Sequence, residues 1–85
     1  MSEPNKLIVM QQLGASIRNQ RRLKKLTLAS LAETVGLKPS YLSEVEQGRR
    51  NPSVWTLFRI ARGLQCKITI LVEPLDSAER TDQEE

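Results

Sequence analysis

The sequence predicts a small, mainly α-helical bundle of four helices followed by one β-strand. Apolar residues recur at spacings of three and four along four consecutive segments, which is typical of helices with one buried face. After Cys66 the apolar spacing changes to two, which is typical of a strand. With 85 residues, the chain has room for one domain.

The first helix is expected over residues 7–25. Its apolar stripe consists of Leu7, Met10, Leu13 and Ile17. Basic residues crowd its end, where positive charge suits the negative pole of the helix dipole; they are Arg18, Arg21, Arg22, Lys24 and Lys25. For Lys24 and Lys25 a solvated helix end is favoured over a phosphate contact.

The second helix is expected to begin after Thr27 and to stop at Gly36. The Thr27 hydroxyl can accept an amide hydrogen bond from the next turn, so Thr27 is the predicted N-cap. One face of this helix is lined by Leu28, Leu31, Ala32 and Val35. Gly36 is the residue best able to take the left-handed conformation that ends a helix and turns the chain.

The third helix is expected over residues 39–47. Pro39 has a preset φ and lacks an N–H, which suits the first position of a helix. Leu42 and Val45 are its predicted buried pair, and Gly48 ends it. The remaining face is polar and can form hydrogen bonds.

The second and third helices together have the spacing of two helices that cross over a tight turn. Ala32 lets them approach closely, Gly36 makes the corner, and Leu37 can fill the gap beneath it. The polar face of the third helix would then fit a DNA major groove, which is about 12 Å wide.

The fourth helix is expected to follow Ser53 as N-cap. Its apolar residues are Val54, Leu57, Phe58, Ile60, Ala61 and Leu64. Trp55 lies beside this stripe, so it is either partly exposed, part of a subunit contact, or packed in the ordinary way, and ordinary packing is favoured.

The strand is expected after Cys66 and before Pro74. Ile68, Ile70 and Val72 fall on one side, and Leu71 falls on the other. A lone strand cannot satisfy its own backbone groups, so we expect it to pair antiparallel with a second copy across a two-fold dimer. The predicted dimerisation residues are Lys67, Ile68, Thr69, Ile70, Leu71 and Val72.

The charge of the chain is unevenly distributed. The whole chain has a net charge of +3, whereas residues 73–85 carry −5, so residues 1–72 carry +8. The strong positive charge of residues 1–72 predicts a polyanion partner. Lysine and arginine side chains that neutralise phosphates release condensed counterions, and this release favours binding. The expected organisation is a DNA-binding domain at 1–65, a dimerisation strand at 66–74 and a disordered acidic tail at 75–85.

The composition argues against an enzyme. The chain has no histidine for acid–base work, its lone Cys66 has no histidine partner, and no glycine-rich phosphate loop occurs. Neither a metal nor a cofactor is expected. The sequence has no apolar run of about 18 residues and no signal-peptide pattern, so a cytoplasmic protein is expected.

The block LTLASLAETVGLKPSYLSEVEQGRRNPS, followed by TLFRIARGL, resembles the lambda-repressor and Cro type of helix-turn-helix domain, also called the XRE family. The resemblance covers residues 13–65. It implies a lambda-repressor-like bundle of four to five helices and a bacterial, sequence-specific repressor, located in the cytosol or nucleoid, that binds double-stranded palindromic DNA as a homodimer.

The resemblance also implies roles for individual residues. The positions that face base edges are Lys38, Pro39, Ser40, Ser43 and Glu44. The positions that meet phosphate are Thr27, Tyr41, Gln47, Arg49, Arg50 and Asn51. Arg21 and Glu46 match a pair that forms a structural salt bridge.

Two positions depart from the family pattern. Leu28 stands where the family commonly has a glutamine that contacts phosphate, so that contact is expected to be absent. Pro39 offers no hydrogen bond at a position that often reads a base. Base specificity is therefore expected from lysine, serine and glutamate chemistry, at Lys38, Ser40, Ser43 and Glu44.

The predicted C-terminal strand makes the chain similar to HipB-type antitoxins. That resemblance implies a kinase-like, HipA-type toxin as protein partner and autorepression of a two-gene operon. The alternative is a stand-alone regulator of the same family, such as a phage repressor or a restriction-modification controller. An adaptor that binds only protein is disfavoured by the +8 body.

Overall fold

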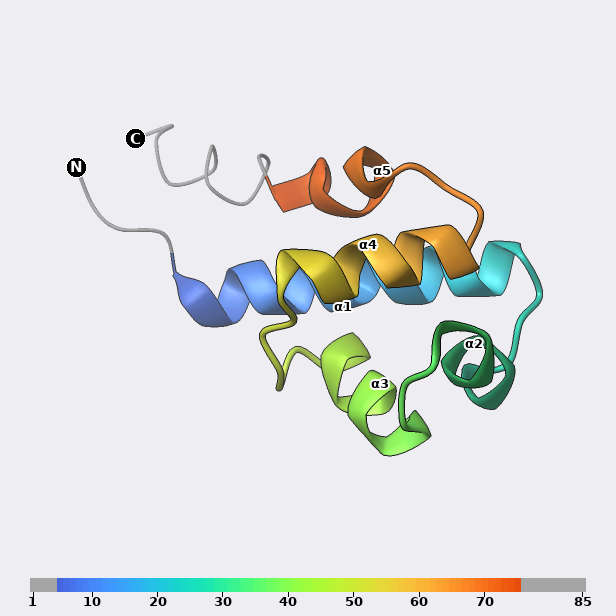
Figure 1. The fold of residues 1–85 in the computed structure, drawn as a ribbon. Helices are drawn as coiled ribbons and strands as arrows, with labels where there is room; N and C mark the ends of the chain where they lie inside the picture. Colours follow the sequence, from blue (N-terminus) through green and yellow to red (C-terminus); the bar gives the residue numbers. More distant parts are fainter. Residues whose placement is uncertain (1–4, 76–85) are drawn as a thin grey trace.

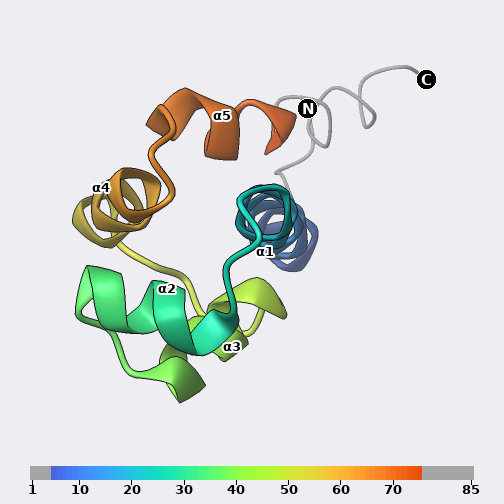
Figure 2. The ribbon, with the colours of Figure 1, turned by 90° about the vertical axis from the view of Figure 1, so that its right-hand side faces the viewer.

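The computed structural model describes residues 5–75, which form five helices and contain no strand (Figure 1). The helices are α1 (Lys6–Leu23), α2 (Leu28–Val35), α3 (Pro39–Glu46), α4 (Val54–Gly63) and α5 (Ile68–Val72). Viewed along α1, they form a ring, with α1 and α4 on opposite sides, α5 closing one gap, and α2 with α3 closing the other (Figure 2). No helix within residues 5–75 has both the length and the apolar character needed to cross a membrane.

The first helix is shifted relative to the predicted 7–25. It begins one residue earlier because the Asn5 side chain caps it, accepting from the backbone N–H groups of Leu7 at 3.0 Å and Ile8 at 3.2 Å. It ends two residues earlier because Lys25 takes a left-handed conformation with φ 59°. The chain turns there and delivers Leu26 to the edge of the core.

The helix-turn-helix has the caps that the sequence predicts. The Thr27 hydroxyl accepts from the Ser30 backbone N–H at 3.0 Å, and Gly36 ends α2 in the left-handed conformation with φ 73°. Pro39 occupies the first turn of α3, and Gly48 turns the chain after it with φ 79°. These four features fix where both helices begin and end.

One core lies at the centre of the ring and receives side chains from all five helices. Its buried apolar residues are Leu13, Ile17, Leu31, Ala32, Val35, Leu42, Val45, Leu57, Ile60, Ala61, Leu64 and Leu71. The predicted buried faces of α2 and α3 are therefore confirmed. Trp55 and Phe58 are different: their rings stack with centroids 5.9 Å apart, and they are 65% and 42% exposed. Ordinary packing, the favoured interpretation for Trp55, is therefore wrong, and Phe58 lies outside the core.

The prediction of a C-terminal strand is corrected by α5. Residues 68–72 form a helix, in which Leu71 is fully buried and Ile70 is 42% exposed, the reverse of their predicted sides, whereas Ile68 and Val72 are partly buried against the core. The apolar residues at 68, 71, 72 and 75 also satisfy helical spacing, and a segment this short fits both periods. A helix provides its own backbone partners and inserts Leu71 between α1 and α4. The pairing of two strands, which was the basis of the predicted dimer contact, therefore has no counterpart in this fold.

The boundary predicted at residue 65 does not separate two packing units within residues 5–75. Leu71 of α5 belongs to the same buried cluster as the helix-turn-helix, and Leu75 packs against that cluster. The rest of the predicted acidic tail, residues 76–85, lies outside the described residues.

Candidate nucleic-acid interface

The two halves of α3 face different surroundings. Lys38, Pro39 and Ser40, at its start, are exposed to solvent. Leu42 and Val45, further along, are buried against the rest of the bundle. A short helix anchored at one end and open at the other suits insertion into a groove. Three of the five predicted base-reading residues lie at this open end.

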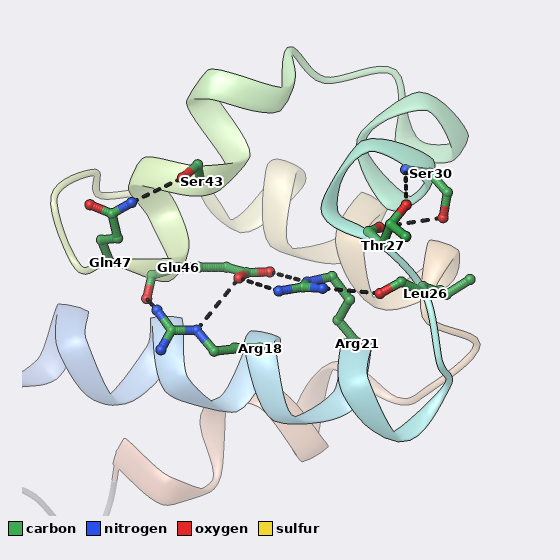
Figure 3. Close-up of polar contacts among 8 residues, drawn as sticks. All are labelled: Arg18, Arg21, Leu26, Thr27, Ser30, Ser43, Glu46 and Gln47. Carbon is green, nitrogen blue, oxygen red and sulfur yellow. Dashed lines mark hydrogen bonds and ion pairs between the residues drawn. The ribbon is translucent and has the colours of Figure 1, made fainter.

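The other two predicted base-reading residues are half-buried and already have polar partners. Gln47 donates from Nε2 to the Ser43 hydroxyl at 2.9 Å (Figure 3). Glu44 pairs with Arg50, whose Nε lies 2.7 Å from Glu44 Oε1. The polar surface of α3 is thus partly ordered by its own neighbours.

The residues predicted to meet phosphate divide into two groups. Gln47, Arg49, Arg50 and Asn51 are exposed where α3 gives way to the following loop, close together in the chain. Thr27 is exposed at the start of α2, where its hydroxyl already caps that helix. Each location can face a polyanion next to α3.

Tyr41 is half-buried, and the Arg50 guanidinium lies over its ring at 5.8 Å from the centroid. This is the range of a cation–π interaction. The Glu44 hydrogen bond raises the pKa of Arg50 above its ordinary value, and arginine is a cation in proteins in any case. Tyr41 therefore supports a charged group of the candidate interface.

Two arginines of α1, Arg18 and Arg21, bind the Glu46 end of α3, called its closed end below (Figure 3). Arg21 donates from Nε to Glu46 Oε2 at 2.7 Å and from Nη2 to Glu46 Oε1 at 3.0 Å. Its third bond, from Nη1, goes to the Leu26 carbonyl at 3.0 Å and reaches the loop before α2. The pair is shielded, with side-chain exposures of 14% and 4%, and its hydrogen bonds raise the pKa of Arg21. Arg21 therefore couples α1, α3 and the α1–α2 loop, and the structure contains the ion pair that the resemblance implies.

Arg18 and Gly14 extend this contact along α1. Arg18 donates from Nη2 to the Glu46 carbonyl at 3.3 Å, and its Nε lies 3.6 Å from Glu46 Oε1. At Gly14, a Cβ atom would lie 2.4 Å from the Glu46 carbonyl oxygen and 2.6 Å from that of Val45. Only glycine allows α1 and α3 to come this close. Neither contact can be read from the sequence, because both depend on how the helices cross.

Arg59 is a third residue whose contact the sequence did not indicate. From α4 it donates to the carbonyl of Val35 and, at 3.3 Å, to that of Gly36. These carbonyls lie at the end of α2, where the helix dipole favours a cation. A basic residue facing a helix end is visible in sequence only when the helix pairing is known. Arg59 thus stabilises the turn at Gly36, which determines how α3 packs on α2.

Comparison with a family model decides the classification. Residues 17–71 match HTH_3, a helix-turn-helix family. The chain belongs to this family. HTH_3 is the XRE family of transcriptional regulators, so the family resemblance drawn from the sequence is confirmed.

Two curated relatives are similar to this HTH_3 chain over most of its length. A regulator of Sinorhizobium fredii, named as the uncharacterized HTH-type transcriptional regulator y4dJ, is 39% identical over 64 residues, which are 75% of this chain and 83% of that protein. The ImmF control region 10 kDa protein of Bacillus phage phi105 is 38% identical over 61 residues, which are 72% of this chain and 68% of that protein.

Solved structures of the family have the same fold. The clp gene regulator ClgR of Corynebacterium glutamicum superposes with a TM-score of 0.79 at 31% identity, covering 94% of this chain and 86% of that one. The restriction-modification controller C.Esp1396I, solved as a tetramer in complex with its natural 35 base-pair operator, superposes with a TM-score of 0.72 at 26% identity. The match covers 82% of this chain and 92% of that one. The mainly helical, lambda-repressor-like fold is therefore confirmed.

Proposed function

We propose that this chain is a repressor that binds specific double-stranded DNA and reads the major groove with the open end of α3. One observation carries the proposal: α1 holds the Glu46 end of α3 rigidly, while Lys38, Pro39 and Ser40 project from the opposite end into solvent. A rigid helix with exposed donors at its start can match base edges in one register. Arg49, Arg50 and Asn51 are exposed in the loop beyond it and supply the positions for phosphate contacts.

We further propose that the repressor binds palindromic DNA as a homodimer. The related controller C.Esp1396I, which is a tetramer on its operator, supports oligomerisation. Residues 68–72 are helical in the single chain, so the proposal does not rely on the predicted ribbon of strands. The exposed face of α5 around Ile70 takes its place in this proposal. Ile70→Asp should leave the fold intact and give monomers by analytical ultracentrifugation, whereas an unchanged dimer mass would exclude this face.

Among the regulators of this family, a stand-alone repressor acting in the bacterial cytosol is favoured over an antitoxin. The expectation of a HipA-type toxin partner depended on a HipB-like C-terminal strand, and α5 occupies that segment. The relatives and neighbours, a phage control-region protein and a restriction-modification controller among them, also favour the stand-alone class. Purification of the native protein followed by mass spectrometry tests this choice, since a stoichiometric kinase-like partner would reverse it.

Selection from a random duplex library tests the main proposal. We expect the full chain to enrich one palindromic sequence and to protect it symmetrically from cleavage. The affinity for that site should fall steeply between about 50 and 200 mM salt, because phosphate contacts release counterions. A flat salt dependence together with no enriched sequence would contradict DNA recognition.

A further inference from the structure

Glu44 and Arg50 form a contact that neither the family resemblance nor the proposed roles of these residues include. Arg50 Nε lies 2.7 Å from Glu44 Oε1, although the two residues belong to different segments, α3 and the loop after it. The separate roles proposed above, base reading for Glu44 and phosphate contact for Arg50, treat each side chain as independent. The structure joins them.

Two further contacts restrict where Arg50 can lie. Its guanidinium is 5.8 Å from the centre of the Tyr41 ring, one turn before Glu44 on the same helix. The loop backbone is tied to α3 as well, because the Arg49 N–H donates to the Glu44 carbonyl at 2.9 Å. Gly48, with φ 79°, makes the reversal that brings the loop back over the helix. Both side-chain contacts of Arg50 come from α3, and they favour one position of its guanidinium over that helix.

The pairing has a chemical consequence for Glu44. An unpaired carboxylate on the reading helix would be repelled by the phosphates that flank a groove. A cation fixed on Oε1 offsets that repulsion and restricts rotation of the carboxylate. Oε2 is left to accept a hydrogen bond, and a cytosine N4 amino group is the base-edge donor that glutamate accepts from.

We propose that Arg50 is a positioning residue for base recognition, which holds the Glu44 carboxylate so that its second oxygen accepts from an amino group on a base edge. The inference rests on the proposed function, and it changes the role of Arg50. A phosphate contact affects all DNA sequences alike, whereas a positioning residue affects discrimination at one base pair and acts only through Glu44.

A double-mutant cycle on the full chain tests the inference. The variants are Arg50→Gln, Glu44→Gln and the double variant, with Arg49→Gln as the matched control because Arg49 is also exposed in this loop. Each is titrated against the duplex selected by the wild-type protein and against all single-base-pair changes in it. Thermal unfolding of each variant verifies that the fold is retained.

We expect Arg50→Gln to reduce discrimination at one base pair about tenfold and to have no further effect on discrimination in the Glu44→Gln background. Arg49→Gln should weaken all duplexes by the same factor. The inference is overturned if Arg50→Gln behaves like Arg49→Gln, or if Glu44→Gln leaves the ranking of duplexes unchanged. These outcomes differ from failure of the proposed function, in which the wild-type protein itself enriches no sequence.

Discussion

The two ends of α3 differ in what determines their side chains. At the Glu46 end, Arg18, Arg21 and Gly14 of α1 surround the backbone and the carboxylate, so these residue types are required by packing and by the need to pair a buried charge. At the start, Lys38 provides no side-chain cap, and Ser40 is exposed. One end is therefore constrained by the fold of the chain itself, whereas nothing in the described residues constrains the side chains at the other, which the proposed function assigns to DNA.

The largest effect is expected from breaking the ion pair at the closed end. Glu46→Ala should lower the free energy of unfolding by about 3 to 4 kcal/mol, because it leaves the shielded Arg21 without its carboxylate. Chemical denaturation measures this loss. Glu33→Ala, at an exposed acid of α2, is the control and should change stability by less than about 0.5 kcal/mol. Equal effects of the two variants would show that the pair adds little stability.

The close approach of α1 and α3 gives the next largest effect. Gly14→Ala should destabilise the fold by about 2 to 3 kcal/mol, because the added Cβ meets two carbonyl oxygens of α3. Its control, Ala15→Gly at the exposed next position, removes helix propensity alone and should cost about 1 kcal/mol. If Gly14→Ala instead raised the melting temperature, the helices would not be in contact there.

Comparing alanine substitutions at Leu71 and Ile70 distinguishes the α5 helix from the predicted strand. Leu71→Ala should cost about 2 kcal/mol more than Ile70→Ala when both are measured in the monomer, because Leu71 is fully buried and Ile70 is 42% exposed. Denaturation at low protein concentration gives both values. The reverse order would support the strand.

The open end of α3 gives the smallest change in stability and the clearest change in binding. Ser40→Ala and Lys38→Ala should each relax base preference by about 1 to 2 kcal/mol, with unfolding unchanged within about 0.5 kcal/mol. Arg49→Ala is the control, since it should weaken specific and non-specific DNA together. Unaltered discrimination by both α3 variants would remove these residues from base reading.

Local signals accounted for most of the fold, and the features that were missed are those whose local signal is absent or ambiguous. The caps Thr27 and Ser53 and the turn glycine Gly36 could be predicted because each acts within about four residues of chain. The end of α1 could not be predicted, because no sequence signal reliably indicates that Lys25 adopts a left-handed conformation. The helical structure of α5 could not be predicted either, because a five-residue apolar segment fits both the helix and the strand period.

The candidate site divides in the same way. Pattern and resemblance indicated the exposed start of α3, at Lys38 and Ser40, whereas Ser43 and Glu44 are half-buried. Pattern and resemblance did not indicate that Arg50 would bind Glu44 or that Arg59 would cap α2, because each pair joins residues from separate elements. The Arg59 contact follows from the angle and distance between α2 and α4, and the Arg50 contact from the turn at Gly48, neither of which is encoded by spacing along one helix.

The exposed start of α3 has a consequence for how proteins of this kind diversify. Lys38 and Ser40 carry no part of the buried core, so exchanging them should leave the melting temperature nearly constant. Under the proposed function, the same exchange alters recognition. If α3 reads DNA as proposed, a duplicated copy can acquire a new operator in few mutational steps without passing through unstable intermediates, because the helix tip diverges while the interior stays the same.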